Sequence, residues 1–316
     1  MAKLTILQMM TAALGEMGLP APASVVNSQD STAVQMLALA NREAKECRAR
    51  TNGSGGWGQL RKENVFQVQS TGVIPGCSYS KNGNVITIGT PPTQAPKVGW
   101  VLSTSGGSNA TGFSYPTYVT AVNGSSITVS NTASMDNSNV AMAFGQESYP
   151  LPSDYDYMIA GTPWDRGFRW PLLGPLTPQE WQSLKSGLSP TGPRRRFRIM
   201  LGAFYLDPIP YDSNLLVYEY YSTAFATGAD GSAKTAFTAD TDIYVLPDDT
   251  MILGMLWRYK RAKGLDYSEE YALYESVLTR ELGRDASAPA LQLDHSASGI
   301  RLLSTQQIPD TGYGIT

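Results

Sequence analysis

The chain has 316 residues, enough for one large domain or two of ordinary size. Hydrophobic residues make up 42% and charged residues only 16%, which argues against a disordered or coiled-coil protein. A formal net charge of -3 disfavours tight binding to nucleic acid phosphates. A single histidine, His295, leaves almost no material for histidine metal sites or catalytic triads.

Two helices are predicted in the first fifty residues. The first carries apolar residues at helical spacing between Leu4 and Leu14 and ends at Gly18. The second starts at an N-cap, Asp30 or Ser31. Its apolar stripe consists of Ala33, Met36, Leu37, Ala40, Ala44 and Cys47. The opposite face is expected to carry Asn41, Arg42, Glu43 and Lys45.

Residues 72–146 differ sharply in composition from the rest of the chain. Their only charged residues are Lys81, Lys97 and Asp136, and Gly, Ser, Thr and Asn are abundant. Asn82-Gly83 and Asn123-Gly124 predict hairpin turns, because both residue types tolerate positive φ. The stretch is therefore predicted to form a small all-β domain inserted into a mixed host.

The host resumes at residue 147. Thr177 predicts the cap of a short helix, and strands are expected over 197–205 and 215–221. A helix starting at Pro247 and another capped by Asp266 follow. The helices around 28–50 and 248–283 are expected to pack together. Four residues are predicted to be largely buried, either in that packing or between neighbouring subunits: Tyr271, Tyr274, Leu278 and Leu282.

The last segment, 285–316, lacks periodicity and is predicted to be an extended arm rather than a domain. Pro289 and Pro309 favour an extended path. Its scattered apolar side chains are candidate partner-binding residues: Leu291, Leu293, Ile300, Leu302, Leu303, Ile308 and Tyr313. A terminus without a binding role is the alternative.

The predicted fold class is α+β. A helical body made of the N- and C-terminal helices, with β-strands, is expected over 1–71 and 147–284. The inserted all-β domain spans 72–146, and the arm spans 285–316.

Arg194, Arg195 and Arg196 form the only basic cluster and are candidate partner-binding residues. They follow a Pro/Gly-rich loop and lie where a strand is predicted to begin. Such a cluster can meet DNA phosphates or an acidic protein, or can simply be a solvated strand edge protected by charge. We favour the edge or a protein contact over DNA.

Catalytic, metal and cofactor sites are not predicted. Acidic residues among aromatic ones are typical of a glycosidase cleft, and they occur here as Asp154, Asp156, Asp165 and Glu180. Turn and cap roles explain these carboxylates better. Cys47 and Cys77 are expected to be two unpaired thiols, although a disulfide remains an alternative. No apolar run is long enough to cross a membrane.

Several stretches resemble tail tubular protein A, the head-to-tail adaptor family of short-tailed phages. They include LTILQMMTAALGEMG, ALANREAKECRAR and GQLRKENVFQV in the first part, and LPSDYDYMIAGTPWDRGFRW, GPLTPQEWQSLKSG, RRFRIM and LPDDTMILGMLWRYKRAKGLDYSEEYALYESVLTREL later. The resemblance covers roughly 3–71 and 147–284, and the order of the motifs is its strongest feature. The insert departs from smaller members and is similar to β modules of phage tail proteins.

The resemblance implies a structural virion protein and not an enzyme. It implies a homo-oligomeric ring, a dodecamer, in the neck of the tail, assembled in the host cytoplasm. The ring would join the portal protein to the tail nozzle, and DNA would pass through it without sequence-specific binding. The arm would reach the portal, and the insert would be free to contact tail fibres. The alternatives are a glycan-degrading tail enzyme and a fibre-anchoring tail binding protein.

Overall fold

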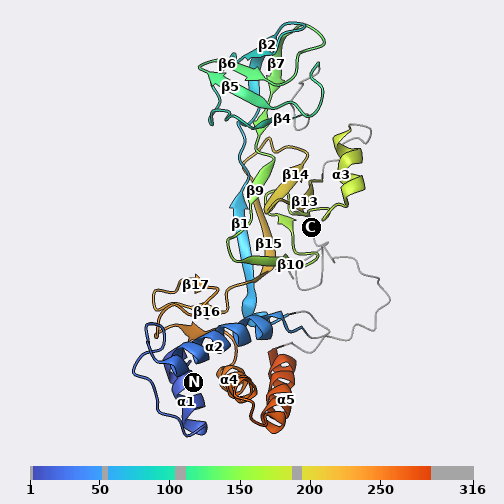
Figure 1. The fold of residues 1–316 in the computed structure, drawn as a ribbon. Helices are drawn as coiled ribbons and strands as arrows, with labels where there is room; N and C mark the ends of the chain where they lie inside the picture. Colours follow the sequence, from blue (N-terminus) through green and yellow to red (C-terminus); the bar gives the residue numbers. More distant parts are fainter. Residues whose placement is uncertain (1–2, 52–55, 104–111, 187–193, 286–316) are drawn as a thin grey trace, which may run out of the picture.

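The computed structural model describes residues 3–51, 56–103, 112–186 and 194–285. The described chain is elongated, with helices at one end, the insert at the other and β-structure between them (Figure 1). Two long antiparallel strands, β1 (Arg61–Gln67) and β15 (Leu215–Ser222), run through the middle.

Four helices form the helical end: α1 (Ile6–Glu16), α2 (Ser31–Ala49), α4 (Asp248–Ala262) and α5 (Ser268–Asp285). Asp30 caps α2 by accepting from Thr32 N, and Pro247 precedes the two acidic residues that open α4. A small sheet of β17 (Ala233–Lys234), β16 (Ala226–Thr227) and β18 (Ile243–Tyr244) packs beside them. These elements share one hydrophobic core.

The middle region contains two sheets. The first joins β1, β15, β11 (Trp164–Asp165) and β12 (Trp170–Pro171), with β10 (Tyr155–Met158) also paired to β15. The second joins β13 (Arg196–Met200), β14 (Ala203–Asp207) and β9 (Ser148–Pro150). The short helix α3 (Pro178–Lys185) begins at a capping box formed by Thr177 and Glu180.

The insert has a core of its own, drawn entirely from residues between Ile74 and Phe144. Its main sheet has the order β5 (Val119–Asn123), β6 (Ser126–Val129), β3 (Val85–Thr87), β2 (Ile74–Tyr79) and β7 (Asn137–Met142). A second pair joins β4 (Val101–Leu102) to β8 (Phe144–Gly145). Whether 72–146 folds independently stays a prediction.

A polar cluster fixes the insert to the middle region. The buried Asp207 carboxylate on β14 accepts from the Tyr115 hydroxyl of the insert at 2.5 Å and from Lys185 Nζ of α3 at 2.7 Å. Lys185 also pairs with Glu147 at 2.6 Å. Buried charges of this kind are stable only when paired, so the contact restricts how the insert is oriented.

The predicted fold class requires correction in its architecture. Helices and strands each take 28% of the described residues, and the strands lie in several antiparallel sheets, giving a mixed, α+β-like structure. The host is therefore not a helical body with accessory strands, because a separate β region lies between the helices and the insert. Four of the eight strands of that region, β9 to β12, have only two to four residues, too few for their alternation to be visible in the sequence. The stretch 197–205 is a hairpin, not one strand.

One expectation about a side chain was also wrong. Glu43 was expected on the outer face of α2, but it is fully buried. Tyr274, Leu278 and Leu282 are buried as predicted. Tyr271 is 40% exposed within the subunit, so its burial between neighbouring subunits stays a prediction. Cys47 and Cys77 are both free, which confirms the prediction of two unpaired thiols.

Candidate partner-binding surface

The three consecutive arginines lie at the start of β13 and diverge there. Arg194 is exposed, Arg195 is buried and Arg196 is half-buried. Successive side chains of a strand point to opposite faces, so neighbouring arginines cannot act as one basic patch. The predicted cluster is therefore divided between the surface and the interior.

Arg195 makes two ion pairs, one with the buried Asp165 and one with the half-buried Asp212. Its Nη1 donates to Asp165 Oδ2 at 2.6 Å, and its Nη2 donates to both carboxylate oxygens of Asp212, at 2.6 and 2.5 Å. Only 5% of Arg195 is exposed. The prediction that Arg195 binds a partner is corrected, because its guanidinium is already used inside the subunit.

Asp165 also organises the hairpin between β11 and β12. Its Oδ1 accepts from the backbone N–H groups of Gly167 and Phe168, both at 2.9 Å. Arg169 completes the turn with a φ of +59°, a region that non-glycine residues rarely adopt. The buried Arg195 lies over the Phe168 ring, 5.3 Å from its centroid. The contacts of Asp165 and Arg195 therefore hold the hairpin in one conformation.

This fixed hairpin presents large apolar side chains to solvent. Phe168 is 37% exposed and Trp170 is 38% exposed, with their ring centroids 6.0 Å apart. The Tyr211 ring lies 6.5 Å from Phe168, and Arg166 pairs with Glu63 of β1. Aromatic residues and arginine dominate the energetic centres of protein interfaces, and they bind best when preorganised. We call Arg166, Phe168, Arg169 and Trp170 the aromatic hairpin.

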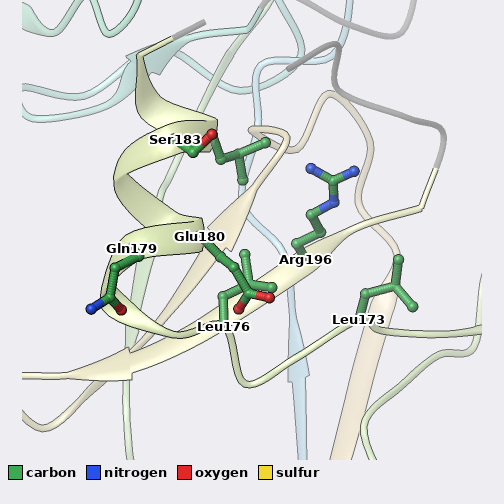
Figure 2. A pocket seen from close by; sticks show the side chains of 7 residues that line it. Leu173, Leu176, Gln179, Glu180, Ser183 and Arg196 are labelled. Atoms are coloured by element: carbon green, nitrogen blue, oxygen red, sulfur yellow. The ribbon is translucent and has the colours of Figure 1, made fainter. Parts of the chain in front are cut away.

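A hollow of about 530 Å³ lies next to it, between α3 and β13. Figure 2 shows Arg196 extending from β13 opposite α3, with Leu176 at the foot of the helix beside Glu180 and Leu173 farther from the helix, beyond Arg196. The remaining lining residues are Gln179, Ser183 and Leu184. Arg196 has no ion pair within the described ranges, whereas Glu180 accepts from Thr177 N at 2.8 Å. The hollow thus offers a positive charge beside leucines.

The sequence predicted the three clustered arginines as candidate residues, but it did not predict the aromatic hairpin. Trp164 and Trp170 were considered only as part of a possible sugar cleft. The signal that could have indicated a hairpin is Asp165-Arg166-Gly167, a short polar turn between two tryptophans. The apolar arm candidates Leu291, Leu293, Ile300, Leu302, Leu303, Ile308 and Tyr313 lie outside the described residues.

The four carboxylates of the glycosidase alternative all have structural partners. Asp154 accepts from Lys62 at 2.6 Å, Ser222 at 2.7 Å and Tyr220 at 2.8 Å, and Asp156 pairs with Arg48 at 3.2 Å. Burial raises the pKa of Asp154, but these hydrogen bonds outweigh it and the net pKa is lowered.

Hydrogen bonds from Thr177 lower the pKa of Glu180 as well. A glycosidase general acid needs the opposite shift, because it must carry a proton near neutral pH. The environments of Asp154 and Glu180 therefore favour structural roles for both carboxylates.

No group of three or more His, Cys, Asp or Glu side chains in the described residues could hold a metal ion. None of the helices in the described ranges has the length and hydropathy needed to cross a membrane. No protein-family model matches the sequence, and no curated protein is significantly similar to it.

Proposed function

We propose that this protein is the head-to-tail adaptor subunit of a short-tailed phage, a structural protein of the virion neck that joins portal to tail nozzle. The proposal rests on the ordered resemblance of residues 3–71 and 147–284 to that family. One structural observation supports it most strongly. The two resembling stretches, separated by the insert, meet in a single buried polar network at the helical end.

Glu43 of the first stretch is the centre of that network. Its Oε2 accepts from Arg258 Nε of α4 at 2.6 Å, and its Oε1 accepts from the Tyr274 hydroxyl of α5 at 2.6 Å. Arg258 also donates to Glu46 at 2.7 Å. Burial raises the pKa of Glu43, while Tyr274 and Arg258 oppose that rise. The insert therefore interrupts the host in sequence without separating its two parts in space.

The surface chemistry fits an assembly subunit better than an enzyme. The aromatic hairpin belongs to the second resembling stretch, and its Trp and Arg side chains are typical of a protein interface. We assign it to contact with the neighbouring subunit or the nozzle. The portal side is assigned to the helical end, and the insert, at the opposite end in Figure 1, is left for the nozzle or fibres.

DNA is expected to pass through the ring without being held. The chain carries a net charge of -3, and of the three clustered arginines one is buried in ion pairs. Tight phosphate binding requires several exposed cations acting together.

The test is assembly with purified portal rings of the same phage, followed by electron microscopy. The expected product is a ring of this protein stacked on the portal, with the same ring in the neck of the virion. Location in a fibre or in the capsid lattice would exclude the proposal. A Phe168→Ala/Trp170→Ala double variant is expected to remain folded but to form rings poorly. Val98→Ala, which truncates an exposed apolar side chain in the insert, is the control.

A separate assay tests the alternative that the protein is a glycan-degrading enzyme. Release of polysaccharide fragments by the purified protein, abolished by Asp154→Asn or Asp165→Asn in a variant that still folds, would favour it over the adaptor.

A further inference from the structure

The two sheets of the middle region pack face to face as a sandwich and share one core (Figure 1). The ring of Tyr218 on β15 stacks on that of Phe204 on β14, with centroids 5.4 Å apart, and the ring of Phe66 on β1 lies 5.6 Å from Phe204. Side chains alternate between the two faces of a strand, so the residues that flank these rings point outward. The sandwich therefore has two outer faces, one on each sheet, that point away from each other.

The outer face of the β1–β15 sheet carries two carboxylates directly opposite each other. Glu63 on β1 and Glu219 on β15 are cross-strand partners, and both are exposed. Like charges in this arrangement destabilise a sheet. Arg166 pairs with Glu63, and Arg61 donates to the Tyr221 hydroxyl at 3.0 Å. The Glu219 carboxylate is left without an ion pair in the described part of the chain.

A hollow of about 430 Å³ adjoins Glu219 on this face. Its lining includes the half-buried ring of Trp164 and the buried Val217. A carboxylate beside an indole ring fits an arginine, because a planar guanidinium can bond a carboxylate through two parallel N–H groups and stack on an aromatic ring. Arg166 of the aromatic hairpin also lines the hollow, so the hairpin borders the same face.

The outer face of the β13–β14 sheet carries the opposite charge. Arg196 and Arg198 lie two residues apart on β13, on the face opposite to the buried Phe197. Both arginines are half-buried, and neither forms an ion pair with another described residue. Asp207 lies across the ladder from Arg196, but its carboxylate already accepts from Lys185. The two arginines therefore present unneutralised positive charge.

The two charged sites lie at the same level of the sandwich. Glu219 follows Tyr218 along β15, and Tyr205, the cross-strand partner of Arg198, follows Phe204 along β14. The stacked rings of Tyr218 and Phe204 thus have Glu219 on one side and Arg198 on the other. Packed sheets are about 10 Å apart and both charged side chains point outward, so they cannot meet within one chain. A contact between them requires a second copy.

We propose that copies of this chain associate head to tail through these two faces, with Arg198 of one copy against Glu219 and Trp164 of the next. Two different faces that complement each other form a heterologous contact, which repeats from copy to copy and makes a ring when the rotation closes. The arginines alone would suit DNA phosphates equally well, but a matching carboxylate on the opposite face favours a second copy. The inference rests on the proposed adaptor function for its place in a ring, and it identifies the contact between subunits.

Chemical cross-linking of the full chain tests the geometry of this contact. A chain carrying both Arg198→Cys and Glu219→Cys, treated with a short bismaleimide, should form a ladder of dimers, trimers and larger species on a denaturing gel. A bismaleimide is needed because two long side chains that pair keep their Cβ atoms too far apart for a disulfide. The natural thiols, Cys47 and Cys77, are buried.

A chain with Val98→Cys and Glu219→Cys is the control, because Val98 is an exposed residue of the insert, and it should give no ladder. Monomers alone from the Arg198 and Glu219 pair, or a product that stops at the dimer, would overturn the head-to-tail contact.

Charge exchange, followed by sedimentation velocity over a range of protein concentrations, tests the chemistry. Arg198→Glu and Glu219→Arg should each weaken self-association roughly tenfold or more, because each variant sets like charges against each other. An equimolar mixture of the two variants should associate again, since alternating copies restore opposite charges at every contact. Lys81→Glu, a charge reversal of the same size at an exposed position of the insert, is the matched control and should associate like the parent protein. A mixture that associates no better than either variant alone contradicts the proposal.

These measurements need no portal, so the two proposals fail separately. If the ladder and the rescue are seen but the protein does not stack on portal rings, the head-to-tail contact stands and the adaptor function does not. If the protein stacks on portal rings while the ladder and the rescue are absent, the adaptor function stands and the contact between these two faces is wrong.

Discussion

Replacing Gly254 by alanine should test how tightly the buried network at the helical end is packed. Gly254 lies in α4, and its missing side chain leaves room for Glu43 of α2. A Cβ at this position would lie 2.5 Å from Glu43 Cγ and 2.8 Å from its Oε1. Glu43 cannot move aside freely, because Arg258 and Tyr274 hold both of its carboxylate oxygens.

Two effects of opposite sign set the magnitude. Alanine is a better helix former than glycine by about 1 kcal/mol, which stabilises the variant. Overpacking a core costs about 1–3 kcal/mol. Losing a hydrogen bond to a charged group costs about 1.5–3 kcal/mol. We therefore expect the free energy of unfolding to fall by about 2–4 kcal/mol.

Urea unfolding followed by circular dichroism measures this difference. Gly15→Ala in α1 and Gly283→Ala in α5 are matched controls, because a Cβ at either position meets no atom within 4 Å. These two variants should be more stable than the parent protein by about 0.5–1 kcal/mol. If Gly254→Ala is as stable as the controls, the reasoning about Glu43 is refuted.

Three further predictions concern polar groups. Arg195→Met should lower the free energy of unfolding by about 3–5 kcal/mol, because the buried carboxylate of Asp165 and the half-buried one of Asp212 lose their partner. Arg194→Met should change it by less than about 0.5 kcal/mol, as urea titration would show. Tyr115→Phe should cost about 1.5–3 kcal/mol in thermal unfolding, because a buried carboxylate loses its hydroxyl donor, and an unchanged midpoint would contradict the polar contact between insert and host. Burial raises the pKa of Asp242, but hydrogen bonds from a lysine and two backbone amides lower it overall, below 3.8. Its stabilising contribution is therefore fully present above that pH and is lost as the pH falls through the folded-state pKa. Stability curves below pH 4 should accordingly be flatter for Asp242→Asn than for the parent protein.

The helices could be predicted from sequence where a local signal marks their start. Asp30, Thr177 and Pro247 each precede a helix at the expected position, because a cap acts within one turn of the residues it stabilises. The two Asn-Gly turns of the insert could also be predicted, because a turn depends only on adjacent residues. Asn82 and Gly124 both have positive φ in the structure.

Features that depend on distant partners could not be predicted. Glu43 looks like a surface residue within its own helix, and it is buried only because Arg258, 215 positions later, accompanies it. Arg195 was assigned to the surface with its neighbours, since Asp165 and Asp212 are not adjacent in sequence. Strands β11 and β12 are each two residues long, too short to show an alternating pattern in the sequence.

The junction between the insert and its host determines which other modules could replace the insert. The segment that enters the insert and the segment that returns to the host are hydrogen-bonded to each other. Ser70 forms a β-bridge with Gly145, and Thr71 N donates to Phe144 O at 2.9 Å. The host therefore has to span the same short gap whatever module fills it. Genetic exchange at these two points would substitute one module for another. A replacement module would need glycine at position 145, where any Cβ would collide with the Pro210 carbonyl oxygen, and a donor to the buried Asp207 in place of Tyr115.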